Sequence, residues 1–185
     1  MLQIKTLITA LTVICIASVC LAGLVTFMLW REAGRVLDHM HVRERMRTSQ
    51  PIRQLSYGEH TVAGALFGSA GRGEVLAAQN ITSMAFAESK APHSLKTLVL
   101  RRMASEQLEQ EFSSTELIHE YLELAYYGSG EYGLEQASRS MFGKDPADLT
   151  REEALALAAI ARIPALRNNP EKLAERVELL KLRVE

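Results

Sequence analysis

The sequence is poor in the residues on which cross-linked and fibrous proteins depend. Its two cysteines, Cys15 and Cys20, both lie inside one long apolar run. Neither can close a disulfide across a soluble domain or join a metal cluster, so the composition excludes a disulfide-stabilised or redox-active cysteine protein. Five prolines, eleven glycines and an aromatic share of 6% exclude collagen-like, mucin-like and low-complexity chains.

An excess of either charge is also missing. The chain carries 21 basic and 22 acidic residues, and this net charge of -1 argues against a nucleic-acid binder or any other general polyanion binder. Residues 31–53 are the exception, with six arginines against three acids, and we call them the basic collar. The collar suits contact with anionic lipid headgroups, at about 1 kcal/mol per charge near the surface. An arginine-rich helix that is simply solvated would have the same composition.

Long apolar runs are rare in the chain, but one stands at its beginning. The 25 residues from Thr6 to Trp30 contain no charged side chain. At a rise of about 1.5 Å per residue, a helix of this length crosses the roughly 30 Å hydrocarbon layer of a bilayer. The run is longer than the apolar region of a cleaved signal peptide, and Trp30 suits the membrane interface. We therefore expect a single uncleaved transmembrane anchor at residues 6–30, after a short tail at residues 1–5.

The positive charges that flank this anchor bear on its orientation. Lys5 and the amino terminus lie on one side, whereas five arginines between Arg31 and Arg47 lie on the other. Cytoplasmic loops carry the excess of Lys and Arg in membrane proteins, so this count by itself places the C-terminal body in the cytoplasm.

Helical patterns dominate the rest of the chain, and no segment shows the alternation of a half-buried strand. The pairs Ser113/Glu116 and Thr150/Glu153 form capping boxes, which open helices. The sequence therefore predicts an all-α protein. We expect residues 31–53 to form a basic juxtamembrane stalk and residues 54–185 one helical domain, with a loop and a short helix up to residue 72, helices at 74–88, 94–112, from 113, at 131–142 and at 151–162, and a last helix beginning at Pro170.

The most informative stretch is residues 113–144, SSTELIHEYLELAYYGSGEYGLEQASRSMFGK. It resembles a signature region of the family 51 glycosyltransferases, the peptidoglycan glycosyltransferases of penicillin-binding proteins, in which S-K-x-x-I-L-E-x-Y-L-N precedes G-x-G-x-Y-G-x-E-x-A and F-G-K. Residues 149–170 resemble the family's next stretch, and Ile81 and Thr82 resemble the centre of its S-T-I-T-Q-Q motif, so the likeness covers about residues 79–184. The matching positions in the first stretch are Ser113, Leu117, Ile118, Tyr121, Leu122, Gly128, Gly130, Tyr132, Gly133, Glu135, Ala137, Phe142, Gly143 and Lys144.

This resemblance implies a fold, a place and a substrate. It implies a lysozyme-like helical lobe on a single anchor at the outer, periplasmic face of the bacterial inner membrane, which is opposite to the orientation that the arginine count favours. The substrate would be lipid II, a lipid-linked disaccharide pyrophosphate, and other proteins of cell-wall synthesis would be partners. The family mechanism uses a glutamate base on the acceptor hydroxyl, a second acid, and cations at the leaving pyrophosphate. No cofactor is implied.

The sequence departs from the family pattern where the chemistry lies. The first motif, E-D-x-x-F-x-x-H-x-G, should fall near residues 44–50, where Glu44 is the one carboxylate and no Phe or His follows in register. In the S-T-I-T-Q-Q-L-A-K-N element, Ser83 and Met84 replace the two glutamines and Ala87 replaces the lysine. Each departure removes a group that the family mechanism needs.

The third family motif, R-K-x-x-E, is also altered. Arg101 and Arg102 fit its basic pair, but Glu106 lies one residue beyond the acidic position, which is about 100° around a helix. The remaining candidates for a catalytic base are therefore Glu44 and Glu106. By the resemblance, the candidates for substrate binding are Thr82, Arg101, Arg102 and Tyr121.

Several other residues allow more than one interpretation. Glu120 and Glu123 could form an acid/base pair, although a solvated helix face is the simpler explanation. His93 and His119 have no carboxylate or cysteine at ligand spacing, so we predict no metal site. The glycines of residues 128–133 favour a turn rather than a phosphate loop, since no strand precedes them. We further expect Tyr121, Leu122, Tyr132 and Phe142 to pack together in the core.

Two functional hypotheses remain. The first is a membrane-anchored relative of the peptidoglycan glycosyltransferases that binds or scaffolds but has lost most or all catalysis. The second is an active glycosyltransferase with a divergent base. Since loss of a general base costs a factor of about 10² to 10⁴ in rate, the sequence favours the first.

Overall fold

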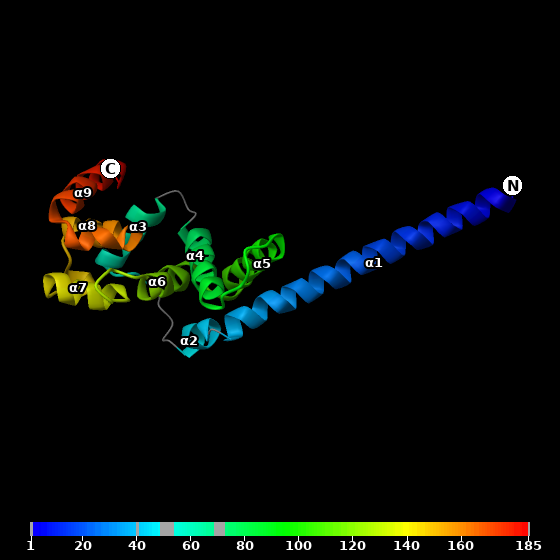
Figure 1. Ribbon diagram of the computed structural model, residues 1–185, viewed down its shortest axis with the longest axis horizontal. Helices are drawn as coiled ribbons and strands as arrows, with labels where there is room; N and C mark the ends of the chain where they lie inside the picture. The colour runs from blue at the N-terminus through cyan, green and yellow to red at the C-terminus, as the bar shows by residue number, and fades with distance from the viewer. Residues whose placement is uncertain (1, 40, 49–53, 69–72, 185) are drawn as a thin grey trace.

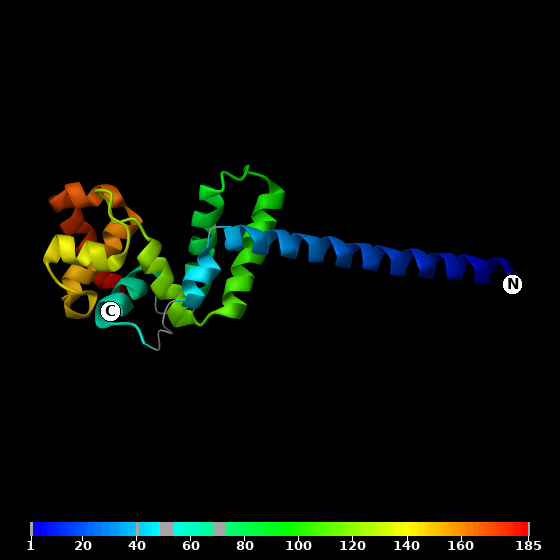
Figure 2. The same cartoon turned by 90° about the horizontal axis from the view of Figure 1, so that it is seen from below.

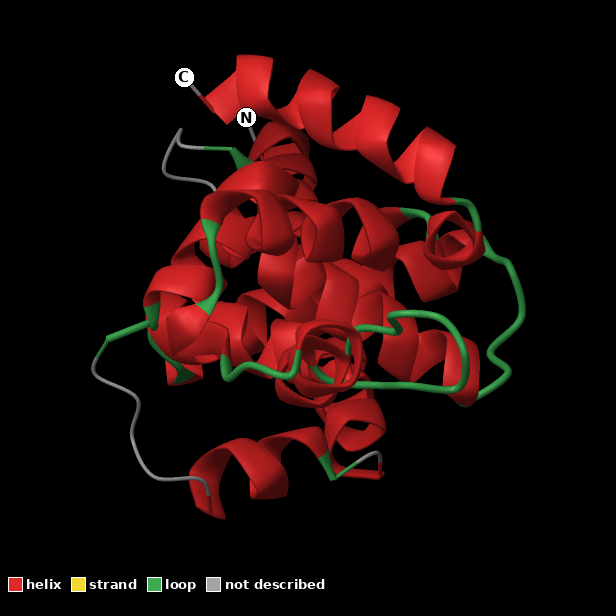
Figure 3. Ribbon diagram, turned by 90° about the vertical axis from the view of Figure 1, so that its left-hand side faces the viewer, coloured by secondary structure: helices red, strands yellow, loops and turns green. Residues whose placement is uncertain are grey.

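The computed structural model describes residues 2–39, 41–48, 54–68 and 73–184. These ranges are helical and contain no strand, only one isolated bridge between Tyr126 and Tyr132 (Figure 3). The predicted all-α fold is therefore confirmed. The helices are α1 (Leu2–His39), α2 (Val42–Thr48), α3 (Tyr57–Phe67), α4 (Gly73–Glu88), α5 (Leu95–Glu111), α6 (Ser114–Leu124), α7 (Leu134–Phe142), α8 (Arg151–Arg162) and α9 (Pro170–Val184), with 3-10 turns η1 (Pro146–Asp148) and η2 (Pro164–Asn168).

The N-terminal helix α1 extends far beyond the body of the protein (Figure 1). Its stretch from Ile14 to Asp38 has a mean hydropathy of 1.9 and is long and apolar enough to cross a membrane. The side chains from Ile14 to Met28 are exposed, so nothing described in the protein covers them. The apolar run from Thr6 to Trp30 thus lies within one unbroken helix.

The segment expected to be a stalk is packed against the body. Ala33 and Leu37 on α1 and Val42 and Met46 on α2 are all buried. The collar therefore does not stand free between anchor and body. Beyond Trp30, α1 becomes part of the hydrophobic core and contacts α5, because small and apolar residues follow one another at helical spacing on one side.

Acidic side chains pair with three arginines of the collar. The Arg43 guanidinium donates to Glu111 at 2.8 Å and to Asp38 at 3.0 Å, and Arg47 also pairs with Glu111. Arg45 donates to Glu120 at 2.6 Å. Three of the collar's six arginines are therefore engaged within the protein. Glu111 and Glu120 lie more than 60 residues from these arginines in the sequence, so local composition could not predict the ion pairs.

The body has two parts that meet at α6. The antiparallel α4–α5 hairpin lies across α1, whereas α3, α7 and α9 pack against α8 (Figures 1 and 2). Helix α6 joins the two parts through its contacts with α4 and α3. Helix α8 is alanine-rich, and its residues from Ala154 to Ile160 are all buried. Its small alanine side chains let neighbouring helices approach closely. Leu155, Leu157 and Ile160 are fully buried and make it the centre of this part.

The local signals for helix ends are confirmed. Both predicted capping boxes form, with the side chain of Ser113 accepting from the Glu116 N–H and that of Thr150 from the Glu153 N–H. Pro170 is the first residue of α9. The predicted helix at 131–142 begins only at Leu134, since the preceding residues form a glycine-rich loop.

The predicted packing of four residues is only partly confirmed. Tyr121 and Leu122 are buried, and the Tyr121 ring meets Phe67 edge-on at 5.1 Å. Phe142 is only half-buried, and Tyr132 is 61% exposed with its ring 5.0 Å from that of Tyr126. The loop before α7 turns Tyr132 outwards, which helix spacing could not predict.

Replacing Leu122 should test this division between core and surface. Leu122 is fully buried, so we expect Leu122→Ala to lower the free energy of unfolding by about 2 to 5 kcal/mol. Tyr132→Ala, the control at an exposed position, should change it by only about 0.5 kcal/mol. Chemical denaturation of the detergent-solubilised full chain measures both. Equal losses for the two variants would contradict this packing.

Candidate functional site

A cluster of polar side chains joins α3 and α6 inside the larger part of the body. Ser56 caps α3, and Glu59 completes a capping box by accepting from the Ser56 N–H at 2.7 Å. The other carboxylate oxygen of Glu59 is hydrogen-bonded to Nδ1 of His119, which projects from α6. One carboxylate thus holds the start of α3 and fixes the imidazole of a second helix.

The surroundings of this pair shift both of its pKa values. Burial alone would raise the pKa of Glu59, but hydrogen bonds from His119 and Ser56 outweigh it and hold this pKa below its ordinary value. The hydrogen bond to Glu59 raises the pKa of His119, and burial only partly opposes the shift. The pair therefore favours a carboxylate beside an imidazolium, an arrangement that can hold a proton at Nδ1.

Glu123, one turn further along α6, lies against the start of α7. Its pKa is raised, chiefly by burial, although the charge of His119 and a hydrogen bond from the Glu135 N–H favour the ionised form. Gly133 makes this contact possible. Its φ is 90°, and a Cβ there would lie 3.1 Å from the Glu123 carboxylate. The side chain of Glu123 therefore binds the N-terminus of α7, where carboxylates are stabilising.

Two cavities open near these helices. The first, of about 680 Å³, lies between α3, the start of α4 and α6, and Glu74 in its wall accepts a hydrogen bond from Ser114. The second, of about 550 Å³, lies between the end of α6 and α7. The first is lined by Leu55, Tyr57, His60, Thr61, Ala63, Gly64, Phe67, Gly68, Gly73, Glu74, Ser114, Ile118 and Arg151, and the second by Glu123, Tyr132, Glu135, Gln136, Arg139 and Ser140.

The two candidate bases do not line either cavity. Glu44 lies on α2, 71% exposed, with its carboxylate 2.8 Å from Nδ1 of His41. Glu106 lies on the surface of α5 and pairs with Arg102 at 3.0 Å. The structure places the two acids on different helices, each beside a basic partner of its own.

The residues predicted to bind substrate make hydrogen bonds or packing contacts within the protein. Thr82 is buried in α4 and donates to the carbonyl of Gln79 at 3.0 Å. Arg101 donates to the hydroxyl of Ser83, which joins α5 to α4. Tyr121 is buried, and burial raises the pKa of its hydroxyl. None of these residues lines the two cavities.

Sequence reasoning missed the Glu59–His119 pair. Glu59 had a local signal, because Ser56 and Glu59 have capping-box spacing. His119 had none, since its partner is 60 residues away. The interpretation of Glu120 and Glu123 as a solvated face is wrong, because Glu120 is buried against Arg45 and Glu123 is half-buried.

The described part of the chain contains no cluster of metal-ligating side chains. Within residues 2–39, 41–48, 54–68 and 73–184, no group of three or more His, Cys, Asp or Glu side chains could hold a metal ion. The arrangement offers instead a fixed carboxylate–imidazole pair, a half-buried carboxyl at the second cavity and a largely apolar first cavity with His60 and Arg151 in its wall.

The Glu59–His119 pair should make stability depend on pH in a defined way. The raised pKa of His119 contributes stability below its ordinary value of 6.5, which is lost as pH rises through the folded-state pKa. The lowered pKa of Glu59 contributes stability at pH values above its ordinary pKa of 4.5, and this stability is lost as pH falls through the folded-state pKa. Between pH 4.5 and pH 6.5, we expect His119→Ala to lower the free energy of unfolding by about 1.5 to 3 kcal/mol. The loss should be smaller below and above this pH range.

Denaturation curves at several pH values measure this difference. His60→Ala, which removes an exposed histidine of α3, serves as the control and should leave the pH profile unchanged. A cost for His119→Ala that is the same at every pH would show that the residue acts through packing alone.

Comparison with known proteins places this arrangement in a family. The profile of the family described as Transglycosylase matches residues 73–184, from the start of α4 to the end of α9. Penicillin-binding protein 2D of Bacillus subtilis (strain 168) is 48% identical over 58 residues, which are 31% of this chain and 8% of that protein. Penicillin-binding protein 1A of Aquifex aeolicus (strain VF5) is 37% identical over 76 residues, 40% of this chain and 10% of that protein.

Another relative is named as a transglycosylase. The biosynthetic peptidoglycan transglycosylase of Rhodospirillum centenum (strain ATCC 51521 / SW) is 48% identical over 52 residues, 28% of this chain and 22% of that protein. The chain thus matches about a tenth of the penicillin-binding proteins and about a fifth of this transglycosylase. Because the family profile extends over more than half of its residues, the chain belongs to the transglycosylase family.

Proposed function

We propose that this protein is a membrane-anchored, transglycosylase-like module of cell-wall synthesis that binds or scaffolds, with lost or much reduced glycan polymerisation. Its ligand would be a lipid-linked disaccharide pyrophosphate or another anionic lipid. One observation carries the proposal: the two candidate bases, Glu44 and Glu106, lie outside both cavities, and each has a basic partner.

The reaction sets geometric demands that these acids meet poorly. A general base must come within about 2.6 to 3.2 Å of the hydroxyl whose proton it takes. Glu44 and Glu106 are instead surface groups on α2 and α5. Arg101, the candidate cation for the pyrophosphate, is hydrogen-bonded to Ser83, and Ala87 offers no charge where the family has lysine. These changes should impair catalysis more than binding of an anionic lipid through the exposed Arg102. Such binding should be weak and sensitive to salt.

The proposed location follows from α1 and from the relatives. A single N-terminal helix long enough to cross a bilayer supports a single-pass anchor in the bacterial inner membrane. A relative named biosynthetic peptidoglycan transglycosylase supports a body on the outer, periplasmic face, where lipid-linked cell-wall precursors are polymerised. The basic residues after Trp30 oppose this orientation by the positive-inside rule, although Arg43, Arg45 and Arg47 are engaged with acids of the body.

One observation favours the alternative, an active glycosyltransferase with a divergent base. Glu123 is a half-buried carboxyl in the wall of the second cavity, and burial raises its pKa. Carboxyls with raised pKa values are typical of general acids and bases. Its hydrogen bond from the Glu135 N–H, however, gives Glu123 a structural role at the start of α7.

A polymerisation assay separates the two functions. We expect the detergent-solubilised full chain, supplied with lipid II, to make no glycan polymer above background, because no base is in position. Glu44→Gln, Glu106→Gln and Glu123→Gln should leave that result unchanged. Processive glycan strands from the unaltered protein would overturn the proposal, and the variant that abolishes them would identify the base.

The orientation of the body can be measured in cells. We expect a reporter that folds only outside the cytoplasm to be active when fused after Glu185, since the proposed ligand is presented on that face. The matched control is a fusion of a reporter that works only inside the cytoplasm, which should be inactive. Activity of the cytoplasmic reporter alone would place the body inside.

A further inference from the structure

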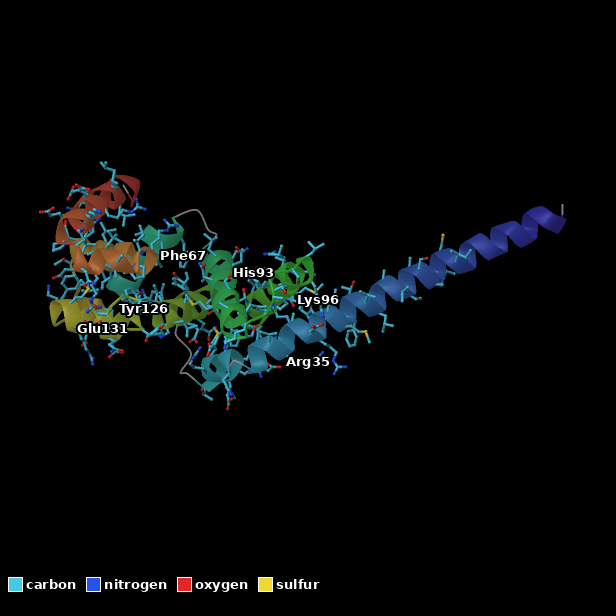
Figure 4. All side chains as sticks on the ribbon, viewed as in Figure 1. Arg35, Phe67, His93, Lys96, Tyr126 and Glu131 are labelled. Carbon is cyan, nitrogen blue, oxygen red and sulfur yellow. The ribbon has the colours of Figure 1, made fainter. Side chains whose placement is uncertain are left out.

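The second cavity lies at the end of the body remote from the apolar span. In both views α7, which forms one of its walls, stands at the opposite end of the protein from the N-terminal part of α1 (Figures 1 and 2). Figure 4 shows Tyr126 and Glu131 of the neighbouring loop at the same end. The cavity's volume of about 550 Å³ falls within the range of about 300 to 1,000 Å³ that small-molecule sites have. Its ligand would therefore come from the aqueous phase and not from a bilayer that α1 crosses.

An exposed aromatic pair stands at the edge of this cavity. Tyr132, which lines it, is 61% exposed, and Tyr126 is 37% exposed. Their ring centroids lie 5.0 Å apart, with the planes inclined at 44°. The Gly130 N–H donates to the hydroxyl of Tyr126 at 3.2 Å, and a backbone bridge joins Tyr126 to Tyr132, so both residues are held in place. The pair forms a preorganised apolar platform, which lowers the ordering cost of binding.

Most charged groups around the cavity are already paired with one another. The Arg139 guanidinium lies 2.8 Å from the carboxylate of Glu135 and donates to Asp145 at 2.7 Å. The hydroxyl of Ser140 donates to Glu131 at 2.6 Å. A charged ligand would have to compete with these pairs. A ligand hydroxyl can instead donate to a carboxylate or accept from a guanidinium without breaking them.

Two further side chains of the wall can bind hydroxyl groups directly. The amide of Gln136 is exposed and is hydrogen-bonded to none of the described residues, so it can both donate and accept. The half-buried carboxylate of Glu123 accepts from the Glu135 N–H and keeps further lone pairs for a ligand. Donors and acceptors thus stand beside an apolar ring. A pyranose sugar has the matching surfaces, because C–H bonds cover its faces and hydroxyls surround its edge.

We propose that the second cavity binds a neutral oligosaccharide, with one pyranose ring on the exposed face of Tyr132 and its hydroxyls hydrogen-bonded to Gln136 and Glu123. An anionic ligand would meet the carboxylates of Glu123 and Glu135, and a cationic ligand would meet the guanidinium of Arg139. The site is separate from the lipid binding on α5 stated under the proposed function and does not depend on it. It would let the protein hold a carbohydrate on the side of the body that is farthest from the anchor.

Saturation-transfer NMR titrations on the full chain test the proposal. The probes are two neutral saccharides, the β-1,4-linked tetramer of N-acetylglucosamine and cellotetraose, and tetralysine serves as a cationic probe. The protein is kept in a detergent without a sugar headgroup, so that the detergent cannot occupy the site. The matched control is Tyr57→Ala, because Tyr57 is 55% exposed but lines the first cavity, whereas Tyr132 is 61% exposed and lines the second.

We expect at least one of the neutral saccharides to bind and Tyr132→Ala to weaken this binding about three- to tenfold. Tyr132→Phe, which keeps the ring, and Tyr57→Ala should bind like the unaltered protein. Gln136→Ala should weaken binding about two- to tenfold. Circular dichroism of each variant checks that its helices are intact.

Three results would overturn the saccharide site. They are binding of neither saccharide, binding that Tyr132→Ala leaves unchanged, and equal weakening by Tyr132→Ala and Tyr57→Ala. Tetralysine binding that Tyr132→Ala abolishes, without binding of either saccharide, would also overturn it and would identify a cation site instead. Polymerisation of lipid II by the protein would contradict the proposed function and leave these outcomes as they are.

Discussion

The union of the anchor helix with the body is the constraint on which the rest of the arrangement depends. The guanidinium of Arg43 reaches Asp38 of α1 and Glu111 and Gln107 of α5, so one side chain joins three helices. It is only 14% exposed, and a partly buried guanidinium with several fixed N–H donors holds its partners in a defined geometry better than a surface lysine would. Around it, Ala33 and Leu37 let α1 and α5 come close.

This union determines which surfaces the protein can present. With α1 continuous from the apolar span into the core, the body cannot turn freely relative to that span. Three of the collar's arginines are engaged inward, and α5 packs against α1. Electrostatic contacts that composition would place at the lipid surface therefore serve cohesion within the protein.

The acidic groups show a similar division between framework and chemistry. The carboxylates of Glu59 and Glu123 cap or join helices, whereas Glu44 and Glu106 stand on the surface. The sequence keeps the family's framework positions, such as Tyr121 in the core and Gly143 in the left-handed turn after α7. A lobe of this family can therefore stay folded while its acids and cations at the expected catalytic positions differ.

Local signals in the sequence determined the helical class, the apolar span, both capping boxes and the family. These features depend on residues within a few positions of one another, so they can be read before the chain folds. Only the tertiary structure decided that His119 meets Glu59, that Arg45 buries Glu120 and that Tyr132 faces solvent. Each of these outcomes depends on how helices far apart in the sequence pack, because burial and long-range partners, rather than residue type, set the environment of a side chain.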